Sequence, residues 1–255
     1  MPPLHTLDPN PTAKPAVLLI HGLEADGSSW TLQLPPLVQV GFRPLAPDMP
    51  GFERSPYAGR GWNIPGMAAR LAKLREDLGT GPAHVVGLSM GGTIAQQFAL
   101  DYPQLTRKLV LVCTFAVLRP ETVSGWFYFL RRFLVVNTLG LPAQAKFVAG
   151  RIFPDPQNES LRQLLVASIL QADPRAYRAA MRALGLFNSV HRLKEIRVPT
   201  LVVTGMKDTT VSPARQKKLA DGIAGAQQVI LPEAGYAFPI DRPDLFNQEL
   251  LSFLK

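Results

Sequence analysis

A serine held between two glycines is the clearest chemical feature of this sequence. The stretch Gly87-Leu88-Ser89-Met90-Gly91 follows an apolar run, HVV, and precedes a helix-compatible segment, GTIAQQFAL. A sharp strand-to-helix turn strains its central residue and tolerates only very small residues two positions before and after it. The turn also sets the serine hydroxyl at a helix N-terminus, where free N–H groups and the helix dipole favour an alkoxide or oxyanion. Ser89 is therefore the candidate nucleophile rather than a capping serine in a glycine-rich turn.

The elements that must position this serine alternate along the chain. Continuous apolar runs are typical of parallel strands covered on both faces. Such runs predict strands at residues 16–20, 44–48, 83–89, 108–113, 199–205 and 227–232. Amphipathic segments predict helices at about 65–78, 91–102, 213–223 and 243–254. The alternation predicts an α/β fold, with a mostly parallel central sheet, helices on both faces and right-handed crossovers.

One interval of the chain departs from this alternation. From about residue 116 to 190 no strand-like run occurs, and helix-compatible stretches are separated by Pro and Gly. The interval is too long and too apolar to be a loop. It predicts an inserted helical cap at residues 116–190, packed over a core domain made of residues 1–115 and 191–255.

Composition limits the kinds of binding partner and the cellular location that we expect for this protein. The chain has 255 residues and a net charge of +8, but its basic residues are scattered singly or in pairs. This spread predicts a solvated basic surface rather than a site for nucleic acid or an anionic membrane. No run approaches the roughly eighteen apolar residues of a membrane span, and the first residues lack the apolar region of a secretory signal. The lone Cys113 excludes an internal disulfide, so we expect a cytoplasmic protein with this thiol buried as a small hydrophobe.

Three further motifs resemble those of the α/β-hydrolase superfamily, and the resemblance covers nearly the whole chain. In order, LLIHGLEADGSSW, PDMPGFERS and TGMKDTTVSP are similar to the family's oxyanion loop, its D-x-P-G-x-G-x-S segment and the strand end that delivers the acid. The resemblance implies that the N–H groups of Leu23 and Met90 form an oxyanion hole, that Asp208 is the acid and that the cap shapes the pocket. It also implies six or seven strands rather than eight, because the N-terminus is too short for the family's full opening hairpin.

The position that resembles the family's catalytic histidine carries a tyrosine. This residue is Tyr236, in the stretch LPEAGYAFPIDRPDLF, and the histidines His5, His21, His84 and His191 all lie where the family's base does not act. A phenol with a pKa of about 10 is a poor acceptor for a serine proton at neutral pH. Loss of one triad member costs on the order of 10^4 to 10^6 in turnover, so we expect weak ester hydrolysis.

Two carboxylates offer a different chemistry. Glu24 and Glu53 stand where the family pattern often carries Gly, on loops that border the pocket mouth. A carboxylate there would oppose a developing oxyanion. Desolvated beneath the cap, Glu24 would instead be a general base for proton transfer, with Tyr236 as a donor or packing group.

The sequence thus predicts a cap-bearing, carboxylesterase-like serine hydrolase acting on a small apolar ester. Its site would combine the nucleophile Ser89 and the acid Asp208 with Tyr236 in place of the base. We expect a substrate pocket lined by His21, Gly22, Trp126, Phe127, Phe129 and Phe238, and no metal or other cofactor. Two classes stay open beside it: a proton-transfer enzyme that uses Glu24, and a protein that binds its ligand without turnover. Monomer and dimer are equally compatible with the sequence.

Overall fold

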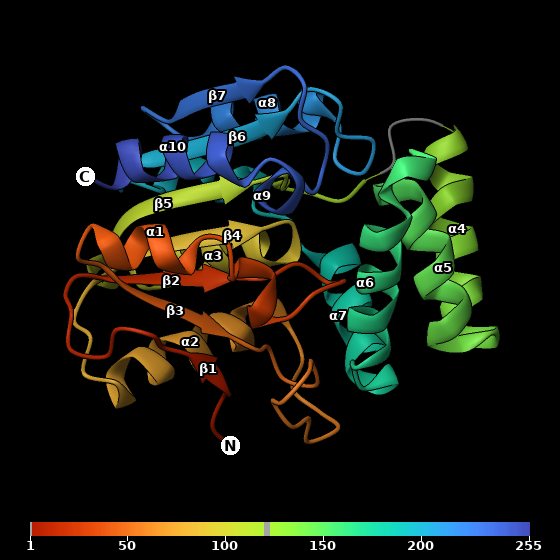
Figure 1. Cartoon of the computed structure of the whole chain (residues 1–255), viewed down its shortest axis with the longest axis horizontal. Coiled ribbons are helices and arrows are strands. Elements are labelled where there is room, and N and C mark those ends of the chain that lie inside the picture. Colours follow the sequence, from red (N-terminus) through yellow and green to blue (C-terminus); the bar gives the residue numbers. More distant parts are fainter. Residues whose placement is uncertain (1, 120–122) are drawn as a thin grey trace.

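A seven-stranded sheet organises the protein, whose computed structural model describes residues 2–119 and 123–255 (Figure 1). The strand order is β1-β3-β2-β4-β5-β6-β7, and only β1 runs antiparallel to its neighbour. The strands are β1 (Thr6–Leu7), β2 (Ala16–Ile20), β3 (Arg43–Pro47), β4 (Ala83–Leu88), β5 (Thr106–Val112), β6 (Thr200–Gly205) and β7 (Gln227–Leu231).

The register of the parallel strands gathers the predicted motifs at one edge of the sheet. Ile20 at the end of β2 pairs with Gly87 of β4, and Leu88 of β4 pairs with Val112 of β5. Because parallel strands point the same way, the loops that follow β2, β4, β5 and β6 meet at their carboxyl ends. This edge receives the oxyanion loop, Ser89, Cys113 and Asp208.

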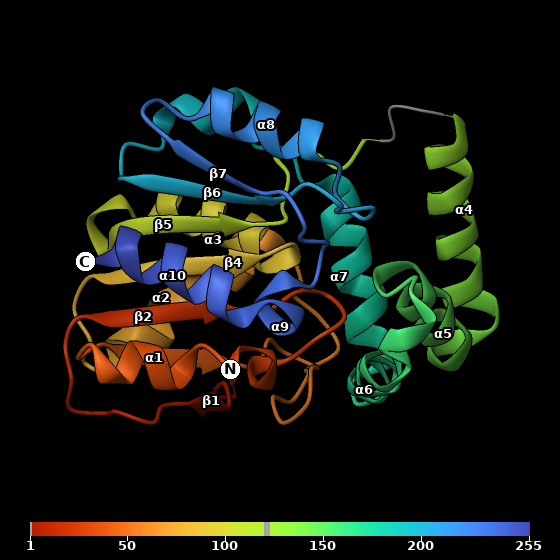
Figure 2. The same cartoon turned by 45° about the horizontal axis from the view of Figure 1, so that its top comes forward.

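Helices cover both faces of the sheet (Figures 1 and 2). One face carries α1 (Leu34–Gln39), α9 (Phe238–Asp241) and α10 (Pro243–Leu254), and the other carries α2 (Ile64–Asp77), α3 (Met90–Asp101) and α8 (Pro213–Gly222). Every residue of β2, β3, β4 and β6 is buried between these layers. The continuous apolar runs therefore predicted the two-sided covering correctly.

Four further helices stand beyond the carboxyl edge of the strands (Figure 1). They are α4 (Val123–Thr138), α5 (Gly140–Ile152), α6 (Glu159–Leu170) and α7 (Pro174–Leu186), and we call them the helical segment 123–186. The chain leaves and re-enters the core at one place, where Ser189 donates its backbone N–H to the carbonyl of Ala116 over 2.9 Å. The division into a core domain and a cap at 116–190 remains a proposal, since a helical segment is not by itself a separate domain.

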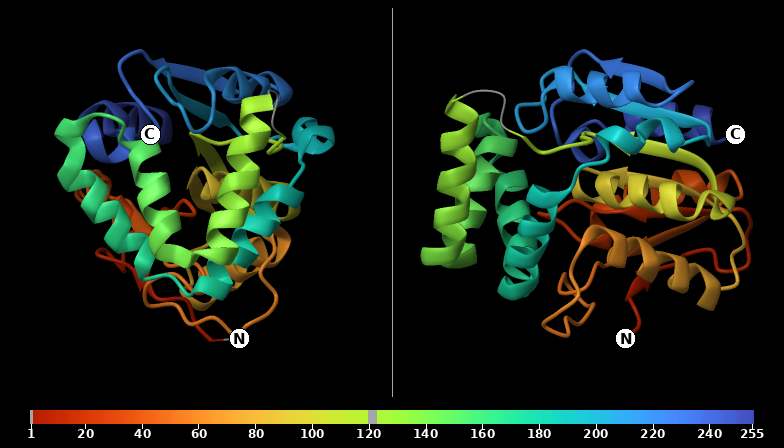
Figure 3. Two further views of the ribbon diagram at one scale, coloured as in Figure 1. Left: turned by 90° about the vertical axis from the view of Figure 1, so that its right-hand side faces the viewer. Right: turned by 180° about the vertical axis from the view of Figure 1, so that it is seen from behind.

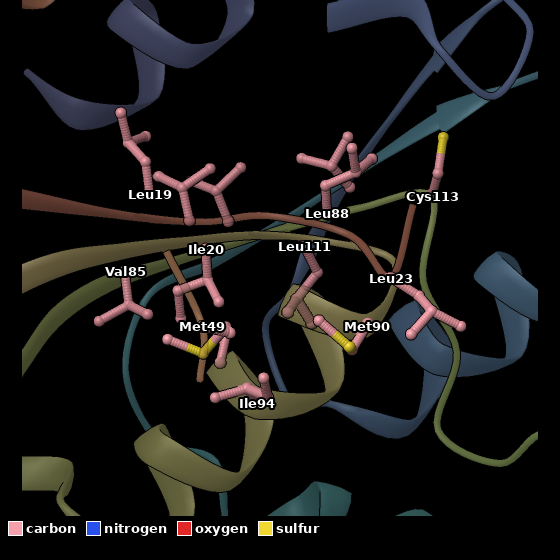
Figure 4. Close-up of a cluster of buried hydrophobic side chains, with 14 of the residues drawn as sticks. Leu19, Ile20, Leu23, Met49, Val85, Leu88, Met90, Ile94, Leu111 and Cys113 are labelled. Atoms are coloured by element: carbon pink, nitrogen blue, oxygen red, sulfur yellow. The ribbon is translucent and has the colours of Figure 1, made fainter. Parts of the chain in front are cut away.

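A cluster of buried apolar side chains lies where the strand ends meet the first turn of α3 (Figure 4). Met90 and Ile94 of α3 are fully buried there, on the same side of the strands as Leu111, whereas Cys113, which directly follows β5, points to the opposite side. The packing of this apolar cluster holds the turn that precedes α3 in one conformation, because tightly packed side chains leave the backbone little freedom.

Most of the predicted elements match the observed ones to within one or two residues. The short antiparallel β1 completes seven strands, the upper of the two expected numbers. Two short helices, α1 and α9, were not predicted, because six and four residues are too few to show a helical period. Among the described residues, no helix is both long and apolar enough to cross a membrane.

Candidate active site

Ser89 occupies the strained turn between β4 and α3. Its backbone has φ 52° and ψ −110°, a left-handed conformation that non-glycine residues rarely adopt. Two hydrogen bonds to the Ser89 backbone hold this strained conformation. The Ser89 N–H donates to the carbonyl of Val112 over 2.9 Å, and the Thr114 hydroxyl donates to the Ser89 carbonyl over 2.7 Å. A residue kept in such a conformation by its surroundings is a signature of a functional turn.

Steric overlap explains why the residues two positions before and after Ser89 are glycines. A Cβ on Gly91 would overlap the carbonyl oxygen of Ile20, and a Cβ on Gly87 would overlap the carbonyl oxygen of Gly91. The turn is therefore closed so tightly that backbone packs on backbone at both positions. This explains the spacing of the glycines around Ser89.

The proposed oxyanion donors lie beside this turn. Met90 is the first residue of α3, so its N–H has no carbonyl partner within the helix. The loop that carries Leu23 is held by His21, whose Nε2 accepts the N–H of Met49 over 2.9 Å while Nδ1 lies 2.7 Å from the carbonyl of Gly22. Nδ1 must therefore carry the proton, and burial lowers the pKa of His21, which keeps the ring neutral.

His21 is thus engaged on both nitrogens and positions the loop instead of acting on Ser89. The other three histidines have separate surroundings: His5 bonds Asp48, and His191 is exposed on the surface. His84 packs against Phe42 at the opposite end of β4, and burial, together with the charges of Arg107 and Lys108, lowers its pKa to about 4.

Tyr236 is the side chain that meets Ser89. Its hydroxyl forms a hydrogen bond with Ser89 and lies 3.3 Å from the point where a Cβ on Gly22 would stand. Burial and, after it, the negative charge of Glu24 raise the pKa of the Tyr236 phenol well above 10, and the bond to Ser89 offsets part of this rise. The phenol is consequently neutral at neutral pH.

Asp208 lies near this pair but is bound by its own surroundings. Its Oδ1 accepts the N–H groups of Thr210 and Val211 over 2.7 and 2.8 Å, and its Oδ2 accepts the amide of Gln216 over 3.1 Å. The Cys113 thiol also donates to this carboxyl group. Burial raises the pKa of Asp208 to about 6 in spite of these donors.

No sequence pattern indicated the hydrogen bond between Cys113 and Asp208. Burial and the charge of Asp208 raise the pKa of the Cys113 thiol well above its usual value, so it is a neutral donor and no nucleophile. Cys113 is fully buried, which agrees with the small hydrophobe expected at this position.

Glu24 is buried as the sequence analysis expected, but it is not alone. Its carboxylate forms an ion pair with Arg132 of α4, and the same Arg132 nitrogen donates to the Tyr177 hydroxyl of α7 over 3.0 Å. Nothing in the sequence pairs Glu24 with Arg132, because 108 residues separate them. The Arg132 guanidinium occupies Oε1 of the Glu24 carboxylate, which weighs against Glu24 as a general base.

A cavity of about 290 Å³ opens beside Tyr236. Its wall is mostly apolar and includes Leu88 and Tyr236 of the core together with Ile152, Leu161 and Leu165 of the helical segment. The polar groups on its wall include Glu24, Asp26, Ser28 and Ser168. Ser89 does not itself line the cavity, so the Tyr236 phenol touches both the cavity and the serine.

The predicted pocket residues divide between this cavity and other places. Gly22 lines it, whereas His21 and Phe238 are fully buried outside the wall. Trp126 and Phe127 are 62% and 67% exposed and Phe129 packs edge-on against Tyr128, so the aromatic residues of α4 do not form the wall as we expected.

Glu53 has φ 45° and lies exposed beside Arg54, and it too is absent from the wall. Within the two described ranges, no group of three or more His, Cys, Asp or Glu side chains is placed to hold a metal ion.

Comparison with known proteins identifies the family of this fold. A family model described as alpha/beta hydrolase fold matches residues 15–243. A protein of Variovorax paradoxus named "Putative carbamate hydrolase RutD" is 31% identical, over 99% of this chain and 96% of its own. A 2-hydroxy-6-oxo-6-phenylhexa-2,4-dienoate hydrolase of Burkholderia cepacia is 27% identical over 94% and 87%. Among solved structures, a thermophilic esterase from Thermogutta terrifontis matches with a TM-score of 0.86 and 29% identity, over 98% of this chain and 92% of its own.

Proposed function

Because the chain belongs to the alpha/beta hydrolase fold family and its relatives are named hydrolases, we propose that this enzyme is a Ser89-dependent hydrolase of small apolar esters that turns over slowly. One observation carries the proposal: Ser89 stands on the strained turn with a neutral phenol, Tyr236, as its hydrogen-bond partner. The turn supports nucleophilic attack, and the phenol explains why that attack is slow.

The first step is attack of the Ser89 Oγ on the ester carbonyl carbon. The N–H groups of Leu23 and Met90 stabilise the oxyanion, the bond to the leaving alcohol breaks, and an acyl-serine forms. Among the described residues, no basic side chain is placed to receive the serine proton, since Tyr236 is a neutral phenol and Asp208 is bound by Thr210, Val211 and Gln216. It must pass to solvent hydroxide, which is scarce at neutral pH.

The second step suffers more from the missing base. A water molecule must attack the acyl-serine, lose its proton and release the carboxylic acid, again without a basic side chain. An activated leaving group such as p-nitrophenolate eases only the first step. We therefore expect the acyl-enzyme to accumulate when an activated ester is supplied.

The cavity supports a small and apolar acyl group. A volume of about 290 Å³ is at the lower end of ligand pockets, which span about 300 to 1,000 Å³. Leu161 and Leu165 of α6 and Ile152 of α5 offer an apolar wall, and the charge of Glu24 is balanced by Arg132. An uncharged acyl chain thus meets no unpaired charge from this ion pair.

A protein that binds its ligand without turnover is the second candidate. The observation that favours it is the position of Tyr236, whose phenol touches both the cavity and Ser89 and so restricts the approach to the nucleophile. Such a protein would return an added ester intact, without an acyl-serine.

Incubation with p-nitrophenyl butyrate, followed by mass spectrometry of the intact protein, tests the proposal. We expect a burst of p-nitrophenolate, then a slow phase, and a butyryl adduct on Ser89. Ser89→Ala should abolish both burst and adduct, while Glu24→Gln, which keeps a hydrogen bond to Arg132, should retain them.

Two results would contradict the proposal. Recovery of intact ester with no adduct would favour the binding protein. Turnover that survives Ser89→Ala but is lost in Glu24→Gln would favour the proton-transfer enzyme.

A further inference from the structure

The outward face of α4 is apolar. Its side chains are at least half exposed at six positions on one side of the helix: Val123, Trp126, Phe127, Leu130, Phe133 and Leu134. Steps of three and four residues along a helix of 3.6 residues per turn place these six in one stripe. Figure 3 shows α4 as an outer helix of the protein.

The inward side of the same helix carries one buried charge among apolar residues. Arg132 is buried, where it forms the ion pair with Glu24 and the bond to Tyr177, and Val136 is also buried. A helix at a protein surface ordinarily turns its apolar side to the core and its charges to water. α4 follows this rule only in part, because it also exposes the apolar stripe. A contiguous exposed apolar face of this kind is typical of an interaction surface.

The charged residues of the α4–α5 hairpin are all basic. Residues 123–152, which form α4 and α5, contain Arg131, Arg132, Lys146 and Arg151 and no Asp or Glu. Arg132 is neutralised by Glu24, but the other three are exposed. The charge that this hairpin presents to solvent is therefore positive, next to a stripe of aromatic and aliphatic side chains.

A shallow open depression joins the two features. It is lined by Phe127, Tyr128, Phe147 and two arginines. The Arg131 guanidinium lies 4.7 Å from the centre of the Phe147 ring, and that of Arg151 lies 4.2 Å from the centre of the Tyr128 ring. These contacts hold two cations at the rim of an aromatic surface, an arrangement suited to an anionic headgroup above acyl chains.

We propose that the outward face of α4 binds the surface of a bilayer that contains anionic lipid. Aromatic and aliphatic side chains would enter the headgroup boundary while Arg131, Lys146 and Arg151 contact the lipid phosphates, the mode of an interfacial amphipathic helix. A second copy of this chain fits less well, because pairing two such faces would bring like charges together. At this face the proposal replaces the solvated basic surface that the scattered charges predicted.

The proposal is independent of the catalytic one, since α4 contributes no residue to the wall of the cavity. The protein also contains its own reporter. Of its three tryptophans, Trp30 and Trp62 are buried, and only Trp126 is exposed. A change in tryptophan emission on mixing with vesicles therefore reports on α4.

The experiment mixes the full chain with phosphatidylcholine vesicles with or without phosphatidylglycerol, and follows Trp126 emission together with co-sedimentation. We expect a blue shift and co-sedimentation with the anionic vesicles, both weakened by added salt. Phe127→Ser combined with Leu130→Ser should weaken the partition at least about tenfold. The matched apolar control is Leu186→Ser, an exposed leucine on α7, which should leave it unchanged.

Charge is tested separately. Arg131→Glu combined with Lys146→Glu should weaken binding to anionic vesicles roughly thirtyfold or more. The control with the same charge change, Lys194→Glu combined with Lys217→Glu, should bind within about threefold of the wild type. Circular dichroism verifies that each variant is folded.

Three results would overturn the proposal. The first is no shift of Trp126 emission and no co-sedimentation with anionic vesicles. The second is equal binding to neutral vesicles that the Arg131 and Lys146 substitutions do not alter. The third is a dimer in sedimentation equilibrium that Phe127→Ser with Leu130→Ser dissociates while vesicles bind nothing, which would make this face a protein interface.

Discussion

Removal of Arg132 should destabilise the protein more than any surface ion-pair substitution. The Arg132 and Glu24 side chains are 10% and 8% exposed, so Arg132→Met would leave the Glu24 carboxylate buried without its cation. Breaking a buried ion pair from one side costs about 3–5 kcal/mol. For a chain of this size each kcal/mol lowers Tm by about 2–4 °C, so the expected loss is roughly 6–20 °C.

Urea unfolding followed by circular dichroism measures this effect. Adding Glu24→Gln to the Arg132→Met variant should recover at least about 1 kcal/mol, because the stranded charge is then removed. The control is Arg192→Met, which breaks an exposed pair with Glu195 and should cost no more than about 1 kcal/mol. If Arg132→Met unfolds within about 1 kcal/mol of that control, the ion pair does not have the buried role assigned to it.

Three further predictions follow from the geometry. With no titrating base beside Ser89, kcat/KM for p-nitrophenyl butyrate should rise about tenfold per pH unit across neutral pH, and a plateau starting near pH 7 would reveal a base. Burial raises the pKa of Asp208 from 3.8 to about 6. Between these two pH values the native protein keeps the Asp208 proton, whereas the unfolded chain has lost it. The free energy of unfolding therefore falls as pH rises from about 4 to about 6 and stays lower above that range. Asp208→Asn should therefore stabilise the protein by up to about 3 kcal/mol near pH 8 and by little near pH 4, as measured by urea titrations at the two pH values. The new amide group can donate a hydrogen bond to Gln216 Oε1, which is buried without a partner among the described residues. Gly91→Ala should prevent folding or cost more than about 3 kcal/mol because of its backbone overlap, whereas Gly150→Ala, in α5 with open space around its Cβ position, should be neutral or stabilise by up to about 1 kcal/mol in the same titrations.

The elements around Ser89 were predictable because their signals are local. An apolar run ending in Gly87, a serine and Gly91 requires a tight turn whichever residues later pack around it, and the observed overlap of backbone atoms is the reason. The sheet was predictable for a similar reason, because a strand buried on both faces must be apolar throughout. Tyr236 could be placed opposite Ser89 only through the family resemblance.

What the sequence could not show depends on long-range packing. The pair Glu24 and Arg132, and the bond from Cys113 to Asp208, join residues 108 and 95 positions apart and leave no local pattern. Periodicity identifies an apolar stripe on α4 but not the side to which the stripe turns. For that reason Trp126 and Phe127 were expected inside the pocket, although both are exposed.

The central claim is that this site is arranged for acyl transfer and lacks only its base, and Tyr236→His tests it most directly. An imidazole with a pKa of about 6.5 would be mostly neutral near pH 7.5, so it could accept the Ser89 proton while Asp208 holds the ring. We expect kcat/KM for a short p-nitrophenyl ester to rise at least about 10^2-fold, and the gain to disappear when Ser89→Ala is added. Tyr236→Phe, which removes the hydroxyl without supplying a base, should give no such gain. A folded Tyr236→His variant with unchanged kcat/KM, or a gain that survives Ser89→Ala, would contradict the account.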